Sequence, residues 1–217
     1  MHIGSIASWT APGADHVHAA AAARHAEDRI LISYDPNVRP GLLGDPHTAR
    51  PLIERWIRVA HVVKASRDDL DWLYPDATPD TVAARWLDLG PVLVVVTDGP
   101  RGATLHQRDT DTRVHRPGRA VAVAVAVADT VGAGDAFTAG LLSALIRRGI
   151  HSPALLRAAR TDALGAALDD AVLVSALTCE RVGADPPYAV TGHDESGDGP
   201  ARPLTPADLT FTGPARS

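Results

Sequence analysis

The stretch DTVGAGDAFTAG, residues 129–140, contains residue types that could handle a phosphate group. The first N–H groups of a helix have no partner within the helix, and the helix dipole adds partial positive charge at that end. Gly132 and Gly134 would let the backbone bend there and let an anion approach closely. The pattern therefore predicts a hole, made of main-chain amides, for a transferring phosphoryl group.

Asp135 stands in the same turn and would repel a phosphate unless it faces a hydroxyl group instead. A positioned aspartate can accept the proton of an alcohol while the oxygen attacks phosphorus. The alternative is that Asp135 only caps the helix. Two other phosphate-binding motifs do not match. A P-loop (Walker A motif) would have a lysine after the glycines, and a dinucleotide fingerprint would have its third glycine where Phe137 stands.

Composition and charge exclude several classes of protein. The chain has 217 residues, 45% of them hydrophobic, so it can bury the core of one ordinary domain. Its net charge of −5, without a basic stripe, disfavours a nucleic-acid partner. Cys179 is the only cysteine, which excludes an internal disulfide and favours the cytoplasm. No apolar run reaches the roughly 18 residues of a membrane helix, and the start does not have the pattern of a signal peptide.

Strand-like and helical patterns alternate along the chain, which predicts a layered α/β domain with a largely parallel sheet. Short apolar runs predict strands at 29–35, 61–66 and 91–99. Apolar residues at helical spacing predict helices at 48–60, 67–74, 81–90 and 135–149, with one or two more between 152 and 183. Residues 102–118 predict a hairpin with a polar tip, and apolar residues alternate strictly over 120–128.

Three polar or glycine-rich segments follow predicted strands or strand-like runs, at 34–39, 95–102 and 128–135. Ligands of such sheets bind outside the carboxyl ends of the strands, so these segments are expected to converge on one site. Trp56, Trp72 and Trp86 fall within predicted helices and are expected in the core.

The end of the chain differs in composition from the rest. From about residue 189 onward it is rich in Gly, Pro, Asp and Thr and has little to bury. We therefore expect one domain over 1–187 and a flexible tail over 188–217.

The glycine-rich segment closely resembles the signature of the ribokinase-like, or PfkB-type, carbohydrate kinases. Other segments agree in order: SYDPNVRPGLL is similar to the Asp-x-Asn-x-Arg segment of the fructokinase and ketodeoxygluconate kinase branch, and VVKASRDDLDWLYP to its strand and acid-bearing helix. VVVTDGPRGATL resembles the family's nucleotide loop, and ALTCERVGADPP its closing segment. The resemblance covers about residues 1–187. It implies a ribokinase-like layered sheet with helices on both faces, and ATP-dependent phosphoryl transfer to a sugar hydroxyl.

The resemblance also implies roles for residues of the glycine-rich segment. Asp135 would be the catalytic base, and the amides of Gly132, Ala133 and Gly134 would form the anion hole. Asp129 would help to hold a monovalent cation, K⁺, beside the nucleotide, and Thr130 would lie near the phosphates.

Further roles fall on the other two segments and on the acid-bearing helix. The ATP site would be lined by Thr97, Gly99 and Gly102, although the glycines could equally punctuate a hairpin. Asp69 would act on Mg²⁺ through water or would be only a solvated helix acid. Ser66 stands where many members of the family have an asparagine. Asn37 and Arg39 would lie near the phosphates or the sugar, or would only stabilise a turn between two prolines.

The start MHIGSIASW is similar to the middle of a family member rather than to its beginning. The first third, which in the family carries the opening strands, a glycine-rich sugar-binding segment and a lid, is therefore expected to be missing. Two hypotheses follow: the ATP-binding part of a fructokinase-like kinase for a sugar or sugar acid, or a non-catalytic nucleotide-binding remnant with a structural or regulatory role. A nucleoside kinase is disfavoured by DPNVRP, and a homodimer is compatible with the sequence.

Overall fold

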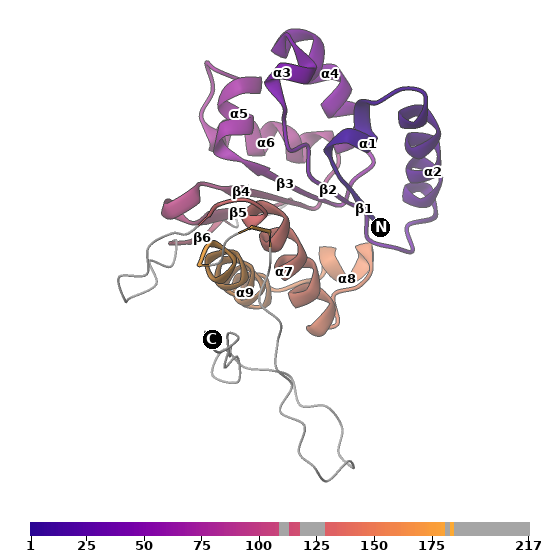
Figure 1. Cartoon of the computed structure of the whole chain (residues 1–217). Helices are drawn as coiled ribbons and strands as arrows, with labels where there is room; N and C mark the ends of the chain where they lie inside the picture. The colour runs from indigo at the N-terminus through magenta and orange to yellow at the C-terminus, as the bar shows by residue number, and fades with distance from the viewer. Residues whose placement is uncertain (109–112, 118–128, 181–182, 185–217) are drawn as a thin grey trace, which may run out of the picture.

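The computed structural model of the chain describes residues 1–108, 113–117, 129–180 and 183–184 (Figure 1). These residues form a six-stranded sheet in the order β1-β2-β3-β4-β5-β6. The first four strands are parallel to one another, and the last two are antiparallel to their neighbours. The strands are β1 (His2–Ile3), β2 (Ser33–Tyr34), β3 (Val62–Ser66), β4 (Leu93–Thr97), β5 (Ala103–Gln107) and β6 (Arg113–Arg116).

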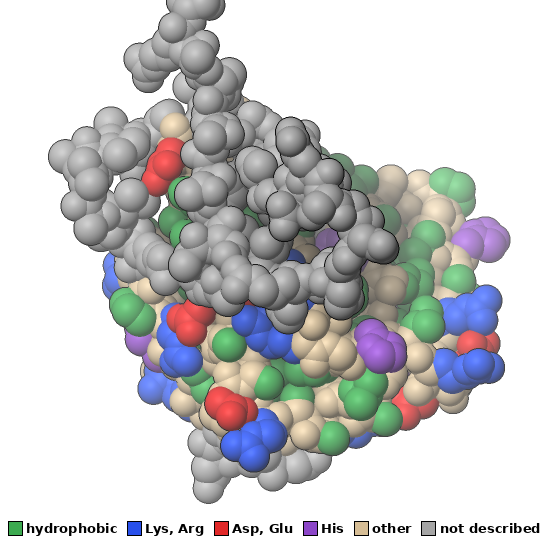
Figure 2. Space-filling model, turned by 90° about the horizontal axis from the view of Figure 1, so that it is seen from below, with side chains coloured by type: hydrophobic (Ala, Val, Ile, Leu, Met, Phe, Trp, Pro, Cys, Tyr) green, Lys and Arg blue, Asp and Glu red, His purple; other side chains and the backbone are tan. Residues whose placement is uncertain are grey.

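Helices cover both faces of the sheet, as the resemblance implied (Figure 1). One face carries α1 (Ser5–Trp9), α2 (Gly13–Glu27), α3 (Pro40–Leu43), α4 (Pro46–Ile57), α5 (Arg67–Leu73) and α6 (Pro79–Leu89). The opposite face carries α7 (Ala133–Arg147), α8 (Pro153–Arg157) and α9 (Thr161–Cys179), so the segment between 152 and 183 forms two helices. On the described residues seen from below, acidic and basic side chains are intermingled (Figure 2).

Local signals explain where the predicted helices begin and end. The Asp45 side chain accepts the His47 amide at the start of α4, and the Thr78 hydroxyl accepts the Thr81 amide at the start of α6. Gly90 ends α6 with a φ of 147°, a conformation that suits glycine. The sequence patterns did not predict β1, α1 or α2, which the structure places at the edge of the sheet (Figure 1).

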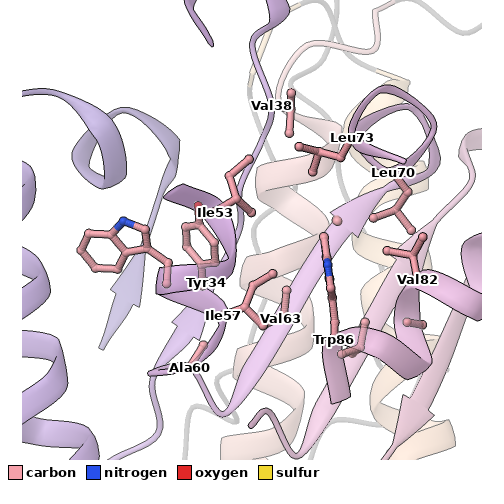
Figure 3. Packing of buried hydrophobic residues seen from close by; sticks show 14 of the residues in the cluster. Tyr34, Val38, Ile53, Ile57, Ala60, Val63, Leu70, Leu73, Val82 and Trp86 are labelled. Atoms are coloured by element: carbon pink, nitrogen blue, oxygen red, sulfur yellow. The ribbon is translucent and has the colours of Figure 1, made fainter. Parts of the chain in front are cut away.

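Two apolar clusters, one on each face of the sheet, form the core. Figure 3 shows part of the first cluster, to which Tyr34 of β2, Val63 of β3 and Trp86 of α6 belong. Trp56 and Trp86 are buried as expected, whereas Trp72 only packs against the edge of this cluster. Burying such large side chains fixes the helices on the sheet, and thereby the loops at the strand ends.

The alternating segment at 120–128 and the tail at 188–217 lie outside the described residues. Within the described part of the chain, no helix has both the length and the apolar character to span a membrane.

A buried histidine, His61, lies just before β3. Its Nδ1 atom accepts the Ile32 amide at 3.1 Å, and its ring stacks on His25 with 4.8 Å between centroids. Burial and the neighbouring His25 lower the pKa of His61 to about 4, although Asp28 opposes the shift. A second proton would place an N–H on Nδ1 facing the Ile32 N–H, so the fold requires the neutral ring.

Acidification should therefore destabilise the fold. In the unfolded chain His61 takes up its proton near pH 6.5, whereas in the folded chain it does so near pH 4. Stability from this residue is complete above about pH 6.5 and is lost progressively as the pH falls toward 4, by roughly 3 kcal/mol in total. Urea unfolding of wild type and His61→Asn at pH 7.5 and 4.5 checks this, since asparagine keeps an acceptor but does not titrate. His151→Gln, at an exposed histidine, is the control; an equal pH dependence in wild type and His61→Asn would contradict the assignment.

Candidate active site at the carboxyl ends of the strands

The turn before α7 has the geometry that the glycine-rich pattern predicts. Gly132 is the residue before the helix and adopts a left-handed conformation with a φ of 79°. A Cβ atom at this position would lie 2.6 Å from the Ala184 Cβ, so the closing segment of the chain packs directly on Gly132. Both the backbone angle and the close approach require glycine here.

The amides at the start of α7 differ in their partners. The Ala133 amide donates to the Thr130 carbonyl at 3.2 Å, and the Ala136 amide donates to the Gly132 carbonyl at 2.8 Å. Within the described residues, the amides of Gly132, Gly134 and Asp135 have no acceptor. An anion would therefore find donors on both sides of Ala133, while Ala133 itself would have to share its N–H with Thr130.

The Asp135 side chain is exposed in the first turn of α7. No hydrogen bond among the described residues ties it to the helix backbone, so the structure does not show it as a cap. Burial lowers the pKa of His2, whereas the Asp35 and Asp135 carboxylates act to raise it, which places the His2 ring within electrostatic reach of both. An exposed carboxylate beside unpartnered amides can accept a proton from an incoming alcohol.

Asp129 joins the turn before α7 to the closing segment. Its Oδ1 atom accepts the Val131 amide at 3.0 Å, and its Oδ2 atom accepts the Gly183 amide at 3.0 Å. These two hydrogen bonds lower the pKa of Asp129 and keep it ionised. Thr130, the next residue, is exposed beside this carboxylate.

A buried ion pair lies against α7, and the sequence patterns did not predict it. Lys64, on β3, donates to Asp35 Oδ2 at 2.9 Å, and both side chains are less than 8% exposed. Thr138 also faces Asp35 Oδ2, at 3.4 Å. A Cβ atom on Gly134 would lie 3.1 Å from the Lys64 Nζ atom, so the ammonium group touches the first turn of α7.

Asp69 holds the segment that carries Asn37 and Arg39. Its Oδ1 atom accepts the Val38 amide at 2.8 Å, and its Oδ2 atom accepts the Ser66 amide at 2.8 Å in a capping box at the start of α5. Burial raises the pKa of Asp69, although the hydrogen bonds from Ser66 oppose the shift. The side chain is thus buried, not the solvated helix acid of the alternative interpretation.

Asn37 and Arg39 follow β2 at the same edge of the sheet. Asn37 adopts a left-handed φ of 39°, and its amide donates to Asp35 Oδ1 at 3.0 Å. Arg39 precedes α3 and is exposed. The loop is therefore held from inside by Asp35 and Asp69, while the exposed Arg39 guanidinium has no ion-pair partner among the described residues.

The segment after β4 forms a tight turn. Thr97 ends the strand and donates to the Ala65 carbonyl at 3.4 Å. Gly99 and Gly102 adopt positive φ angles of 49° and 97°, and the Asp98 amide donates to the Gly102 carbonyl at 2.7 Å. This turn joins the antiparallel strands β4 and β5, as the hairpin interpretation expects, and it leaves the Gly99 backbone exposed.

The carboxylate oxygens of Asp69 and Asp129 suit a metal ion that arrives bound to a phosphate ligand better than one that the protein side chains hold alone. Among the described residues, no group of three or more His, Cys, Asp or Glu side chains could hold a metal. Asp69 and Asp129 each have both oxygens engaged with amides, which leaves one lone pair per oxygen for water or a monovalent cation. Mg²⁺ commonly keeps several waters and binds through substrate phosphates, which fits this set.

The mixed sheet with helices on both faces makes this an α/β protein, and amide donors without acceptors among the described residues lie at the start of α7. The sequence pattern of the pfkB family of carbohydrate kinases matches residues 2–190. The chain belongs to this family. It is 38% identical over 145 residues to a fructokinase of Rhizobium leguminosarum bv. trifolii, a match that covers 67% of this chain and 42% of the relative.

Solved structures of the same family share the fold. The fructokinase of Vibrio cholerae O395, solved in a form that binds fructose, ADP and calcium ion, is 29% identical with a TM-score of 0.68. The aminoimidazole riboside kinase of Salmonella enterica, complexed with aminoimidazole riboside and an ATP analogue, is 26% identical with a TM-score of 0.67. Both matches cover 84% of this chain, and they cover 55% and 57% of the respective relatives. The chain thus spans little more than half of the solved relatives.

Proposed function

We propose that the chain carries the nucleotide-binding and catalytic-base portion of an ATP-dependent kinase for a sugar hydroxyl, with a ketose such as fructose as the first candidate acceptor. The observation that carries the proposal is the start of α7, where amides that have no acceptor within the described residues lie beside an exposed Asp135. The similarity to fructokinases, and the Asp-Pro-Asn-Val-Arg segment at 35–39, support the choice of acceptor.

In the proposed reaction the chain mainly positions and polarises groups. The amides of Gly132, Gly134 and Asp135 would bind the oxygens of the terminal phosphoryl group, and Ala133 would add a shared N–H. The Asp135 carboxylate would accept the proton of the attacking hydroxyl while the bond between that phosphorus and the ADP oxygen breaks. Arg39 would stabilise the charge that develops on the phosphates.

The nucleotide would lie across the strand ends that the structure brings together. Thr97, Gly99 and Gly102 would contact it from the turn after β4, and Thr130 from the turn before α7. Asp129 would stay ionised and favour K⁺ beside that turn. Asp69 would reach Mg²⁺ only through water, and the ion when bound would neutralise phosphate charge.

The proposal is tested by measuring ADP release with ATP, Mg²⁺ and K⁺ over a panel of hexoses, pentoses and keto-sugar acids. Release that depends on one class of sugar, with fructose expected among the best, would support a kinase. Binding of ATP without any sugar-dependent release would instead support the non-catalytic nucleotide-binding role. Absence of nucleotide binding would contradict both.

A further inference from the structure

The role of the Lys64–Asp35 pair is not accounted for by the proposed base and amides. Lys64 is the only lysine in the chain, and its side chain is 7% exposed. Taking an ammonium group out of water is costly unless its partners compensate. Lys64 has three N–H donors, and Asp35 Oδ2 accepts one of them. Among the described residues no other acceptor of Lys64 is found, so two donors remain for another acceptor.

The location of the ammonium group points to the nature of that acceptor. Its Nζ atom lies 3.1 Å from the place where a Cβ of Gly134 would stand, beside the first turn of α7. That end of a 15-residue helix carries partial positive charge, so a buried cation there is repelled by the helix dipole. An anion placed between Lys64 and the unpartnered amides would turn this repulsion into attraction from both sides.

Asp35 would keep other hydrogen-bond donors if the Lys64 ammonium group also bound a second anion. Its Oδ1 atom accepts the Asn37 amide, and its Oδ2 atom also faces the Thr138 hydroxyl. The single proton of the Thr138 hydroxyl can go to the Gly134 carbonyl, at 3.1 Å, or to Asp35 Oδ2, so Thr138 connects the carboxylate to the first turn of α7. This network keeps the ammonium group aimed at Gly134 and not at solvent.

From these contacts we propose that Lys64 is a further catalytic residue, which binds the phosphoryl group as it moves from the nucleotide to the acceptor. This inference rests on the proposed function and adds a cation to it. The acceptor oxygen forms a bond to phosphorus, the bond from phosphorus to the ADP oxygen breaks, and the hydroxyl proton goes to Asp135. Lys64 remains protonated throughout and contributes charge alone.

Lys64→Met tests the inference through binding, because methionine keeps the length of the side chain and removes its charge. Calorimetric titration with a non-hydrolysable ATP analogue and with ADP, each with Mg²⁺, separates the terminal phosphoryl group from the rest of the nucleotide. We expect about tenfold weaker binding of the triphosphate, which corresponds to about 1.4 kcal/mol, and a change of less than about twofold for ADP. Lys64→Arg should recover part of the loss.

Two further variants keep the test decisive. If Lys64→Met does not fold, the double variant Asp35→Asn with Lys64→Met removes both charges together and should show the same selective loss. Arg58→Met, which removes one exposed charge at the end of α4, is the control and should bind both nucleotides as wild type does. Equal weakening for ATP analogue and ADP, or no weakening, would overturn the role of Lys64 while leaving the proposed function intact. A wild-type chain that binds neither nucleotide would overturn the proposed function itself.

Discussion

Asp135→Asn is expected to lower sugar-dependent ADP release by about 10²- to 10⁴-fold, the range that a lost general base produces. Asparagine has nearly the shape of aspartate but cannot accept the proton of the attacking hydroxyl. Because the carboxylate is exposed and no hydrogen bond among the described residues involves it, the fold should not depend on it. Initial rates at saturating ATP and sugar, together with calorimetric binding of the ATP analogue, measure the two effects separately.

Asp162→Asn provides a matched control for this variant. Asp162 is an exposed acid in the first turn of α9, so its replacement also removes one negative charge from a helix start, together with its contacts to Arg160 and the Ala163 amide. The control should retain the wild-type rate. Undiminished turnover in Asp135→Asn would refute the assignment of the base, and a parallel loss of nucleotide binding would show that the carboxylate has a structural role.

Gly132→Ala should damage both the fold and the nucleotide site. A methyl group there would meet Ala184 at 2.6 Å in a backbone conformation with a φ of 79°, so the closing segment would have to move. Overpacking and backbone strain together predict a loss of roughly 2–5 kcal/mol in the free energy of unfolding. Urea unfolding measures that loss, and calorimetry should show weaker binding of the ATP analogue in any folded fraction.

Gly149→Ala separates the two causes. Gly149 has a φ of 77°, nearly that of Gly132, but a Cβ atom there would meet nothing within 4 Å. Gly149→Ala should lower the free energy of unfolding by only about 1 kcal/mol, because it adds backbone strain without overpacking. Equal losses in the two variants would show that the contact between Gly132 and Ala184 contributes nothing.

The sequence predicted the elements whose signals are local. Apolar spacing predicted α4 and α6 but placed their starts at 48 and 81, two residues after the prolines at which the structure begins them. The buried strands β3 and β4 are apolar apart from Lys64 and the terminal Ser66 and Thr97. The positions of Gly132 and Asp135 at the start of a helix could be predicted because glycines and an acid before an apolar run of helical spacing form a recognisable pattern. The ribokinase-like fold expected from the resemblance is confirmed by the solved relatives.

Other features depend on contacts between distant residues, and no local pattern shows them. β1 has two residues and α2 is rich in alanine, so neither has a clear period. The only available hint of the Lys64–Asp35 pair was a lysine inside an apolar strand, which needs a partner when buried. The Ser66–Asp69 capping box was recognisable from its spacing, but the contact of Asp69 with the Val38 amide joins two strand ends and requires the fold.

The most direct test of the central claim is the response of single amides to the terminal phosphoryl group. The ¹⁵N resonances of Gly132, Gly134 and Asp135 can be followed while an ATP analogue or ADP is added with Mg²⁺. The account predicts large shifts at these three amides with the triphosphate and much smaller shifts with ADP. Unchanged resonances at all three while the nucleotide binds would contradict it.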